Sequence, residues 1–408
     1  TYQRGDKKIY GMTIPENMKS TNLKPERKNA WEVGLDWRFL DSRIGVDLTY
    51  YKENTRNQIM TINVPWESGV KEKLINAGNI QNSGIEIALN TTPIKKKQWQ
   101  WDLNFTYTRN RNKIVELSPD VTSYINLDGA ANYGNYRIAS VAKVGSDYGM
   151  LLSDSWIKTD EKTGKPVVGY TNKFRTVYYK RGGTVKEVGS MLPNFLGSLN
   201  STVRWKDLSL YVLFDARFGG YVASYNSRYA TAYGFSGETE KYRKGMTWTS
   251  KYANAQDKVF TDGFIPDVVF DAGTIVTTPG GTNQDVSGMT YQEAYEKGYV
   301  EPAHLQSAAY FKNSWGTCVI NDDWFKKINY IALREITLSY NVPTKICSYI
   351  GAKNLSLSFT GRNLAYLLNT APNHENPESV RGTGAAQFRM RSFMPYTASY
   401  LFTLNATF

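Results

Sequence analysis

Apolar and polar residues alternate along most of the chain, which is the pattern of β-strands with two unlike faces. Over residues 31–39 the odd positions hold Trp, Val, Leu, Trp and Phe, and the positions between them are mostly charged. The same alternation recurs over residues 44–50, 85–89, 99–107, 195–205, 208–216, 336–340, 355–359 and 396–408. This pattern predicts an all-β protein with about ten to twelve antiparallel strands.

The predicted strands and their connections point to a membrane. Strands of about 10–18 residues exceed the 5–6 usual in soluble sheets, and they suit tilted strands that cross a bilayer. Short turns are predicted at residues 41–42, 93–98, 206–207 and 343–353, and long polar segments at about 63–76, 110–140, 219–325 and 369–390. Short turns at one end and long extracellular loops at the other are typical of transmembrane β-barrels. A large soluble β-sandwich or propeller that binds carbohydrate is the alternative.

The last predicted strand and the aromatic residues fit the same architecture. Tyr400, Phe402, Leu404 and the terminal Phe408 share one face, as on a lipid-facing strand that closes a barrel. We therefore predict that these four residues form a barrel-insertion signal. Aromatic residues near strand ends are expected in an interfacial girdle, and they include Trp31, Tyr50, Tyr51, Trp99 and Trp101.

Composition narrows the function classes. The hydrophobic fraction of 41% is too high for a disordered chain, and no run approaches the roughly 18–20 apolar residues of a spanning helix. Two His and two Cys provide little for a zinc site, a catalytic triad or a disulfide scaffold. No carboxylate pair of the kind used by glycosidases falls on one strand face, and the loop aspartates lack calcium-loop spacing. We expect no enzymatic activity, no cofactor and no metal.

The formal net charge of +12 allows several partners. Nucleic acid is not expected, because no recognition motif accompanies the scattered basic residues. Attraction to anionic outer-membrane lipid is one interpretation, and an acidic remainder of a longer protein is another.

Several segments resemble a known family. Residues 23–39 (LKPERKNAWEVGLDWRF) and 76–94 (NAGNIQNSGIEIALNTTPI) resemble barrel strands of TonB-dependent outer-membrane receptors. Residues 188–220, 322–346 and 359–378, together with Phe408, resemble the SusC/RagA branch of Bacteroidota. These segments extend over nearly the whole chain, and they occur in the same order as in that family.

This resemblance implies a TonB-dependent transporter in the outer membrane. It implies import of glycan oligosaccharides or peptides that a SusD/RagB-like surface lipoprotein captures, with energy delivered through TonB. It also implies an N-terminal plug, a 22-stranded barrel and a dimer of transporter–lipoprotein pairs. The alternative is a surface or secreted β protein that binds glycans without transporting them.

The start of the chain raises the question of a missing part. Residues 1–17 show neither an initiator Met nor a signal-peptide pattern. The strand count is about half of a 22-stranded barrel, and half a barrel would leave open edges in lipid. We expect residues 1–408 to be the C-terminal part of a longer barrel protein, with plug and remaining strands elsewhere. A self-contained smaller barrel is the alternative.

Candidate site residues follow from the strand faces. Tyr211, Asp215 and Arg217 fall on a polar face, where they would line the substrate route or hold the plug. The same two roles apply to a group whose face would change at a β-bulge, namely Arg334, Glu335, Arg362 and Asn363.

The segment 219–325 is the largest predicted loop. It carries aromatic residues that would either contact the surface lipoprotein or pack the loop on itself, among them Tyr225, Tyr229, Trp248 and Trp315. Within it, Thr290 and Glu293 have capping-box spacing, which predicts a short helix.

Overall fold

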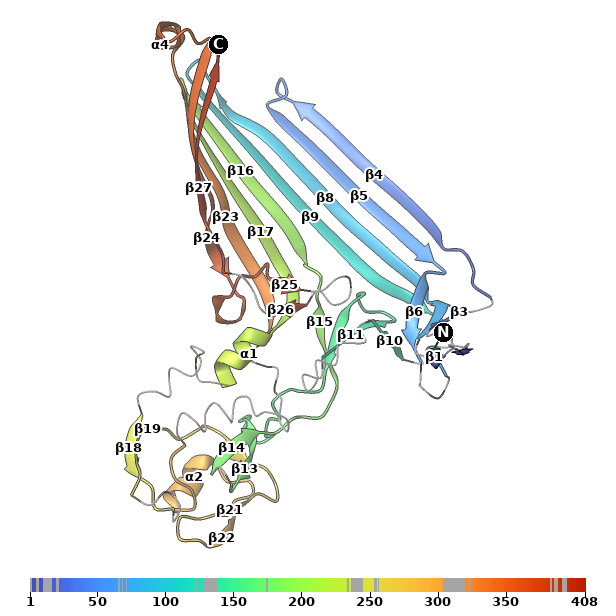
Figure 1. The fold of residues 1–408 in the computed structure, drawn as a ribbon, viewed down its shortest axis with the longest axis vertical. Helices are drawn as coiled ribbons and strands as arrows, with labels where there is room; N and C mark the ends of the chain where they lie inside the picture. The colour runs from blue at the N-terminus through green and yellow to red at the C-terminus, as the bar shows by residue number, and fades with distance from the viewer. Residues whose placement is uncertain are drawn as a thin grey trace.

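The computed structural model shows a large, curved antiparallel sheet (Figure 1). It describes residues 2–4, 7–9, 17–19, 22–64, 67, 69–70, 72–119, 121, 123–127, 138–173, 175–232, 235, 245–252, 255, 257–303, 320, 322, 324–381, 384, 388–390 and 395–408. The sheet has eleven strands, nine of which follow one another in the order β27-β24-β23-β17-β16-β9-β8-β5-β4. The predicted all-β class and strand number are confirmed.

The long strands of the sheet are formed by segments of nine to nineteen residues. They are β4 (Arg27–Phe39), β5 (Ile44–Arg56), β8 (Gly78–Lys95), β9 (Trp99–Leu117), β16 (Phe195–Trp205), β17 (Leu208–Ser224), β23 (Phe325–Asn341), β24 (Asn354–Asn369) and β27 (Ser399–Thr407). Two short strands complete it, β25 (Val380–Arg381) and β26 (Arg389–Met390). In the described part of the chain, β27 and β4 lie at the two edges.

Short and long connections separate to opposite ends of the sheet (Figure 1). Residues 40–43 join β4 to β5 through three residues with positive φ, and residues 206–207 join β16 to β17. The helix α4 (Thr344–Tyr349) lies in the β23–β24 connection, at the same end as the C-terminus. The predicted arrangement of turns and loops is confirmed.

Two predicted strand ends are wrong. β8 continues through the predicted turn at Pro93, because the register shifts between Thr91 and Ile94 and a proline is tolerated at such a bulge. The Arg43 guanidinium donates to the carbonyl oxygens of Thr92 and Pro93 at 3.0 and 2.7 Å. The sequence also predicts that the strand beginning at residue 44 runs on through Asn57 and Gln58 towards Ile62, but β5 stops at Arg56.

The chain leaves the sheet after β5 because Asn57 adopts a positive φ of 55°. The next segment, β6 (Ile59–Asn63), pairs with β7 (Glu72–Asn76) in a separate sheet that also contains β3 (Asn17–Lys19). Near the start of the chain, β1 (Tyr2–Arg4) pairs with β2 (Lys7–Ile9).

The main sheet has one apolar face and one polar face. Residues directly opposite in an antiparallel ladder point to the same side. One such row joins Leu35, Leu48, Ile87 and Tyr107 across four strands. On this face large apolar side chains are exposed, for example Trp37 at 60% and Phe402 at 72%. In water such a face would be unfavourable, whereas in a bilayer it meets lipid, as predicted for a transmembrane wall.

The opposite face is held by polar pairs between neighbouring strands. Asn104 donates to Asn200 at 2.7 Å, Thr106 and Ser198 lie 2.7 Å apart, and Thr337 and Thr360 lie 2.9 Å apart. The expectation that Tyr51 belongs to the lipid girdle is wrong, because Tyr51 pairs with Gly84 and shares the polar face with Glu32 and Glu86.

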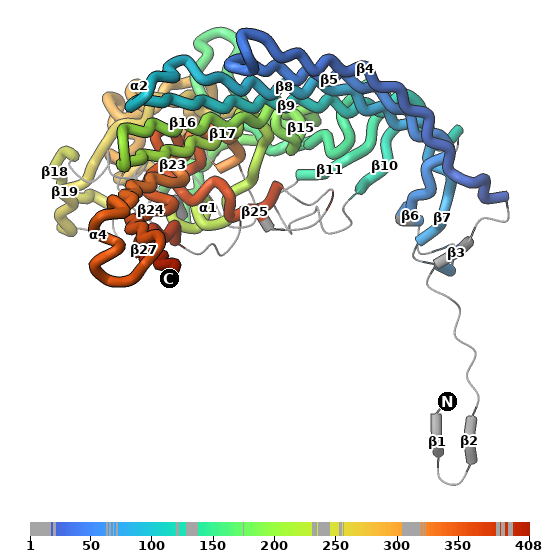
Figure 2. Tube along the Cα trace, turned by 90° about the horizontal axis from the view of Figure 1, so that it is seen from above, coloured from blue at the N-terminus to red at the C-terminus, as the bar shows by residue number. Residues whose placement is uncertain are grey.

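The polar face is the concave one. Figure 2 shows the sheet as an arc, with the segment that carries β25 inside it. Glu378 lies just before β25, and its carboxylate bonds to Arg334 on the polar face. The polar face therefore lines the inside of the barrel wall, and the apolar face lies outside.

The long connections form a group of small sheets and helices at one end of the main sheet, here called the loop body (Figure 1). One small sheet contains β10 (Tyr124–Asn126), β11 (Ile138–Lys143), β12 (Met150–Ser153) and β15 (Lys186–Ser190). Another contains β13 (Val167–Thr171), β14 (Thr176–Tyr179) and β20 (Val269–Phe270). Two hairpins add β18 (Met246–Thr249), β19 (Val259–Gly263), β21 (Ile275–Thr277) and β22 (Asn283–Asp285).

The loop body has a hydrophobic core that continues onto Ala223 of β17 and Phe325 of β23. Side chains from both long connections are fully buried in it, including Leu151, Val168, Phe270, Tyr291 and Trp324. The predicted loop at 110–140 is too short, since β9 continues to Leu117 and the connection extends to residue 194.

Helices are few and short in the part of the chain that the structure describes. They are α1 (Tyr225–Ala232), α2 (Tyr291–Glu296), α4 and the 3-10 helix η4 (Pro372–His374). The predicted capping box is confirmed, because Thr290 and Glu293 cap α2 reciprocally. No helix within the described ranges is long and apolar enough to cross a membrane.

The two faces predict opposite effects of one added charge. Leu48→Arg places a guanidinium in the middle of the apolar face, which destabilises a barrel by about 2–4 kcal/mol near the bilayer midplane. Thr49→Arg, one residue along the same strand, points to the polar face beside Glu86. We expect Leu48→Arg to reduce the amount of heat-modifiable, membrane-inserted protein and Thr49→Arg to leave it near the parental level. Equal losses would contradict the assignment of the faces.

Candidate functional site

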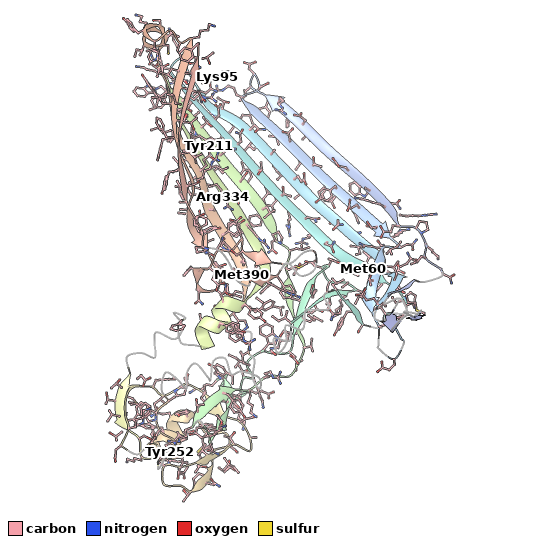
Figure 3. All side chains as sticks on the ribbon, in the orientation of Figure 1. Met60, Lys95, Tyr211, Tyr252, Arg334 and Met390 are labelled. Carbon is pink, nitrogen blue, oxygen red and sulfur yellow. The ribbon has the colours of Figure 1, made fainter. Side chains whose placement is uncertain are left out.

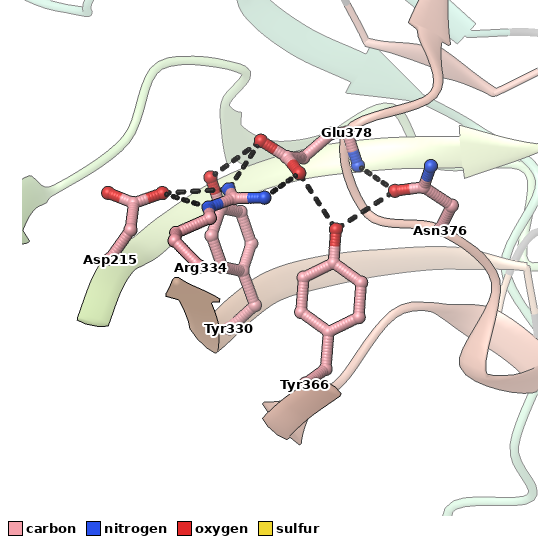
Figure 4. A network of polar contacts seen from close by, with 6 residues as sticks. All are labelled: Asp215, Tyr330, Arg334, Tyr366, Asn376 and Glu378. Carbon is pink, nitrogen blue, oxygen red and sulfur yellow. Dashed lines mark hydrogen bonds and ion pairs between the residues drawn. The ribbon is translucent and has the colours of Figure 1, made fainter. Parts of the chain in front are cut away.

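The most connected polar site on the concave face is centred on Arg334 (Figure 4). Arg334 lies at a β-bulge, since the ladder pairs Leu213 with Glu335 and Phe214 with Leu333 and skips the residue between them. The ladder on the other side of β23 shifts at the same place. The bulge turns the Arg334 side chain onto the concave face. The sequence predicts that a bulge changes the face of this residue.

Arg334 binds two carboxylates at once. Its Nη2 lies 2.8 Å from Asp215 Oδ2 and 2.7 Å from Glu378 Oε1, and its Nη1 lies 2.7 Å from Glu378 Oε2. The pair with Glu378 is bidentate, the strongest geometry available to an arginine and a carboxylate. Three segments far apart in sequence, β17, β23 and the connection after β24, are thus held together.

Tyrosines surround this ion-pair network. Tyr366 donates to Glu378 Oε2 at 2.8 Å, and Tyr330 donates to Oε1 at 3.4 Å (Figure 4). The ring of Tyr396 lies 4.7 Å from that of Tyr366, and among the described residues its buried hydroxyl has no hydrogen-bond partner. Two carboxylates and one guanidinium give the network a formal charge of −1, with tyrosine hydroxyls at its rim.

The predicted residues Tyr211, Asp215 and Arg217 share the concave face without converging on one point. Asp215 belongs to the network, whereas Tyr211 lies further towards the short-turn end, opposite Thr337 (Figure 3). Arg217 is half-buried, and it donates to the carbonyl oxygens of Met191 and Gly219 at 3.2 and 3.3 Å. These contacts indicate that Arg217 fixes the start of β16 and the end of β17.

The predicted partner-loop residues lie in different parts of the loop body. Tyr225 and Tyr229 stack on α1 with ring centroids 5.7 Å apart, and Tyr229 is 38% exposed. Trp248 stacks on Phe260 at 4.7 Å and donates to Glu301 at 3.4 Å. Trp315 lies outside the described residues. The contacts of Trp248 and Tyr225 include packing within the loop body, the simpler of the two predicted roles.

The predicted insertion-signal residues line one face of the last strand. Tyr400, Phe402 and Leu404 follow the apolar face of β27, beside Phe359 and Leu357 of β24. Each is more than half exposed, as is Phe408.

Sequence reasoning missed Glu378, Tyr330 and Tyr366. Glu378 lies in a polar connection with no strand pattern, so its approach to Arg334 is visible only in three dimensions. The detectable signal was Arg334 next to Glu335 inside a strand, where two adjacent charges interrupt the alternation. A bulge explains that interruption, because it lets neighbouring residues share one face.

A second carboxylate in the same connection is buried. Glu375 is 7% exposed, and its Oε2 accepts a hydrogen bond from Ser224 Oγ at 2.6 Å. Burial raises the pKa of Glu375 to about 7, although the bond from Ser224 opposes that shift. For Glu378, burial also acts to raise the pKa, but hydrogen bonds from Arg334 and Tyr366 outweigh it and the pKa lies below its usual value.

The site offers fixed charges and hydrogen-bond donors. The expectation that no carboxylates meet on one strand face is wrong, because Asp36 lies opposite Asp47 on the concave face and Arg38 donates to both. Among the described residues, no group of three or more His, Cys, Asp or Glu side chains is placed to hold a metal ion.

Comparison with known proteins decides the family. Residues 6–234 match the family described as TonB dependent receptor-like, beta-barrel, which is more than half of the chain. The chain belongs to this family of TonB-dependent receptor β-barrels. Members are outer-membrane proteins, and the family consists of receptors and transporters rather than enzymes. The receptor barrel explains both the apolar convex face and the separation of turns from loops.

Curated relatives carry the same assignment. The TonB-dependent receptor P26 of Formosa agariphila is 22% identical over 363 residues, which cover 87% of this chain and 31% of the relative. The TonB-dependent receptor SusC of Bacteroides thetaiotaomicron is 29% identical over 169 residues, or 41% of this chain and 16% of SusC. The chain thus spans about a third of the P26 receptor.

Solved structures share the barrel fold. The RagAB peptide transporter matches with a TM-score of 0.57 at 14% identity, over 94% of this chain and 35% of that chain. The RagAB peptide importer in its closed-closed state gives the same TM-score at 15% identity. The predicted similarity to the SusC/RagA branch is confirmed.

The Arg334 network predicts a local loss of stability. Glu378→Gln removes one of two carboxylates from a mostly buried guanidinium, which costs about 1–2 kcal/mol. We expect faster hydrogen–deuterium exchange over residues 370–381. Glu335→Gln is the control, because Glu335 pairs with the more exposed Arg362 at 2.9 Å on the same strand pair. Similar exchange in both variants would argue against a special role for the network.

The two carboxylates of this connection predict opposite pH responses. A raised pKa means that folded Glu375 holds its proton more tightly than the unfolded chain, so its contribution to stability falls as the pH rises from about 4.5 to about 7. Glu375→Gln should remove this loss of stability. At pH 8 we expect the free energy of local opening of α1, measured by hydrogen exchange, to rise by at most about 3 kcal/mol.

Glu378 provides the matched control for this pH experiment. Its lowered pKa means that its contribution is complete above the unfolded value and is lost as the pH falls. Exchange protection of α1, corrected for the intrinsic pH dependence of exchange, is the measurement. A Glu375→Gln variant that keeps the parental pH profile would show that Glu375 does not titrate in this range.

Proposed function

We propose that residues 1–408 are the C-terminal part of a TonB-dependent outer-membrane transporter that imports oligomeric nutrients. The observation that carries this proposal is a membrane-crossing wall with an apolar convex face and a concave face covered by hydrogen-bonded polar side chains. A concave polar wall suits a hydrated route across the membrane. Family membership and the coverage of about a third of the longer relatives support the same conclusion.

The two sheet edges support a larger barrel. An edge strand in lipid leaves unpaired backbone N–H and C=O groups that no water satisfies. We propose that further strands of the same protein pair with β4 and β27 and close the wall. A plug domain inside the closed barrel and a segment that contacts TonB complete the proposed transporter.

The Arg334 network is proposed to hold the plug. Arg334 already donates hydrogen bonds from all three of its guanidinium nitrogens to two carboxylates, while the network as a whole keeps a formal negative charge. A lysine or arginine of the plug would neutralise it, with Tyr211 lining the same wall nearer the short turns. Direct contact of Tyr211 and Asp215 with the imported substrate is the second interpretation. Arg217 has mainly a positioning role.

The loop body is proposed to contact a SusD/RagB-like surface lipoprotein. It lies at the end of the sheet opposite the short turns, and α1 presents the stacked pair Tyr225 and Tyr229 at its base. Trp248 and Trp315 are the further candidates. RagAB is named as a peptide transporter, whereas the curated relatives carry no such term, so we propose glycan oligosaccharides or peptides as cargo. A dimer of transporter–lipoprotein pairs completes the proposal.

The alternative is a surface β protein that binds glycans without transport. A secreted, soluble version fits poorly, because the exposed convex face would place Trp37, Phe402 and similar residues in water. Import requires energy delivered through TonB, whereas binding without transport does not, so the two functions can be distinguished by experiment.

Uptake in cells with and without TonB tests the proposal. The complete protein is expressed with its lipoprotein, and the probes are a fluorescent oligosaccharide mixture and a fluorescent peptide mixture. We expect one probe to bind at the surface in both strains and to enter only the strain with TonB. Asp215→Asn, with Thr202→Ser as a control on the same face, should change uptake more than surface binding. Equal entry in both strains would indicate a passive pore, and binding without entry in either would indicate a surface binding protein.

A further inference from the structure

The convex face of β5, β8 and β9 carries basic residues just beyond its apolar belt. The ladders define successive rows across β4, β5, β8 and β9. The row of Leu35, Leu48, Ile87 and Tyr107 is apolar. The next row towards the loop body holds Val33, Tyr50, Ile85 and Arg109. The row after that holds Trp31, Lys52, Ser83 and Arg111, and Lys113 follows one row further out.

Charge on these four strands is sorted by face. The β8–β9 ladder has a bulge where its register shifts between Asn79 and Ile80. Between the tight turns and this bulge, the charged residues at outward positions are all basic: Lys52, Arg109, Arg111 and Lys113. The first carboxylate, Glu116, lies beyond the bulge. The acidic residues of these four strands in the same region lie in the intervening rows, on the concave face, and they are Glu32, Asp36, Asp47, Glu53, Glu86 and Asp102. The outward basic group therefore has no acidic neighbours on its own face.

These cations are available for a ligand. Within the described residues, none of Lys52, Arg109, Arg111 and Lys113 makes an ion pair within 4 Å. The carboxylate of Asp147, in the loop body, interacts electrostatically with Arg111. One carboxylate leaves most of the positive charge of the group uncompensated.

Two members of the basic group, Arg109 and Arg111, line a hollow on the sheet. An open depression of about 390 Å³ is lined by Tyr50, Ser83, Gly84, Ile85, Arg109 and Arg111. In the central row the small Ser83 stands between Lys52 and Arg111, whose strands are about 10 Å apart. Two long cationic side chains can therefore meet over a hydroxyl donor, a geometry that fits the oxygens of one phosphate group.

The height of the group matches the edge of the bilayer. On β9 the outward apolar positions run from Trp99 to Tyr107, which is about 27 Å along the strand at the usual rise. With the tilt typical of barrel strands this gives about 20 Å, close to the apolar band of outer-membrane barrels. Trp31 and Tyr50, with ring centroids 5.4 Å apart, lie at the same height as the first cations, where an aromatic girdle belongs.

We propose that Lys52, Ser83, Arg109 and Arg111 form a binding site for the phosphate groups of an anionic lipid in the outer leaflet. The acyl chains of that lipid lie along the apolar rows below, and its headgroup fills the hollow. A lipid is favoured over free phosphate because the cations are continuous with the apolar belt. The site lies on the outside of the wall, so it is independent of the transport proposal and requires only the membrane location.

Lipid binding by the complete protein tests the site. The purified protein is titrated in nanodiscs of zwitterionic lipid that contain a bisphosphorylated lipid A, its dephosphorylated form or phosphatidylglycerol. The variant is Lys52→Gln with Arg111→Gln. Since each interfacial cation contributes about 1 kcal/mol towards anionic lipid, the variant should bind phosphorylated lipid about 30-fold more weakly.

The matched control removes the same charges from the other face. Lys28→Gln with Arg38→Gln also takes away one lysine and one arginine, both exposed and paired with concave-face carboxylates. It should bind lipid like the parent, and so should Lys52→Arg with Arg111→Lys, which keeps the charge. Heat-modifiable migration checks that each variant is folded.

Three results of the binding comparisons would overturn the proposal, and a competition with inorganic phosphate provides a fourth. They are equal losses in both neutralised variants, unchanged binding in the Lys52 and Arg111 variant, and equal affinity for the dephosphorylated lipid. Displacement of the lipid by millimolar inorganic phosphate would show a free-anion site instead of a lipid site. Preference for phosphatidylglycerol over lipid A would support a phosphate site for phospholipid headgroups.

Discussion

The backbone ladder of the main sheet is the constraint on which the rest of the structure depends. Successive rows of paired residues face lipid and the concave interior in turn, so a shift of one residue would reverse both faces of a strand. The turns after β4 and β16 set the register at one end. Bulges near Pro93 and Arg334 absorb the irregularities without changing the face of the remaining rows.

The alternation of residues was sufficient to predict the wall. The outward rows of β4, β9 and β27 are visible as Trp, Leu and Phe at every second position, because the two environments differ most there. Strand ends were less predictable. β5 ends because Asn57 adopts a positive φ, a conformation that asparagine tolerates but that its presence in the sequence does not predict. Pro93 remains inside β8 because Arg43, in the β4–β5 turn, donates to the carbonyl oxygens of Thr92 and Pro93.

The candidate site could be predicted only in part, for a related reason. Asp215 and Tyr211 follow the strand period, so their face was visible in the sequence. Glu378 reaches Arg334 from an irregular connection, and no local pattern links residues 44 positions apart. In the loop body the capping box of α2 was predictable because it needs only Thr290 and Glu293, whereas the packing of Phe270 and Trp324 depends on the whole fold.

The parallel pairing of β13 with β20 has a consequence for the order of assembly. It joins Val167 to Val269, about 100 residues later in the chain, and the core around it also includes Trp324. Closing so long a segment carries a large entropic cost before the contacts can form. The first long connection therefore has no complete core until the second has emerged on the same side of the membrane. The loop body must then form late and as one cooperative unit, after the strands that carry it have crossed.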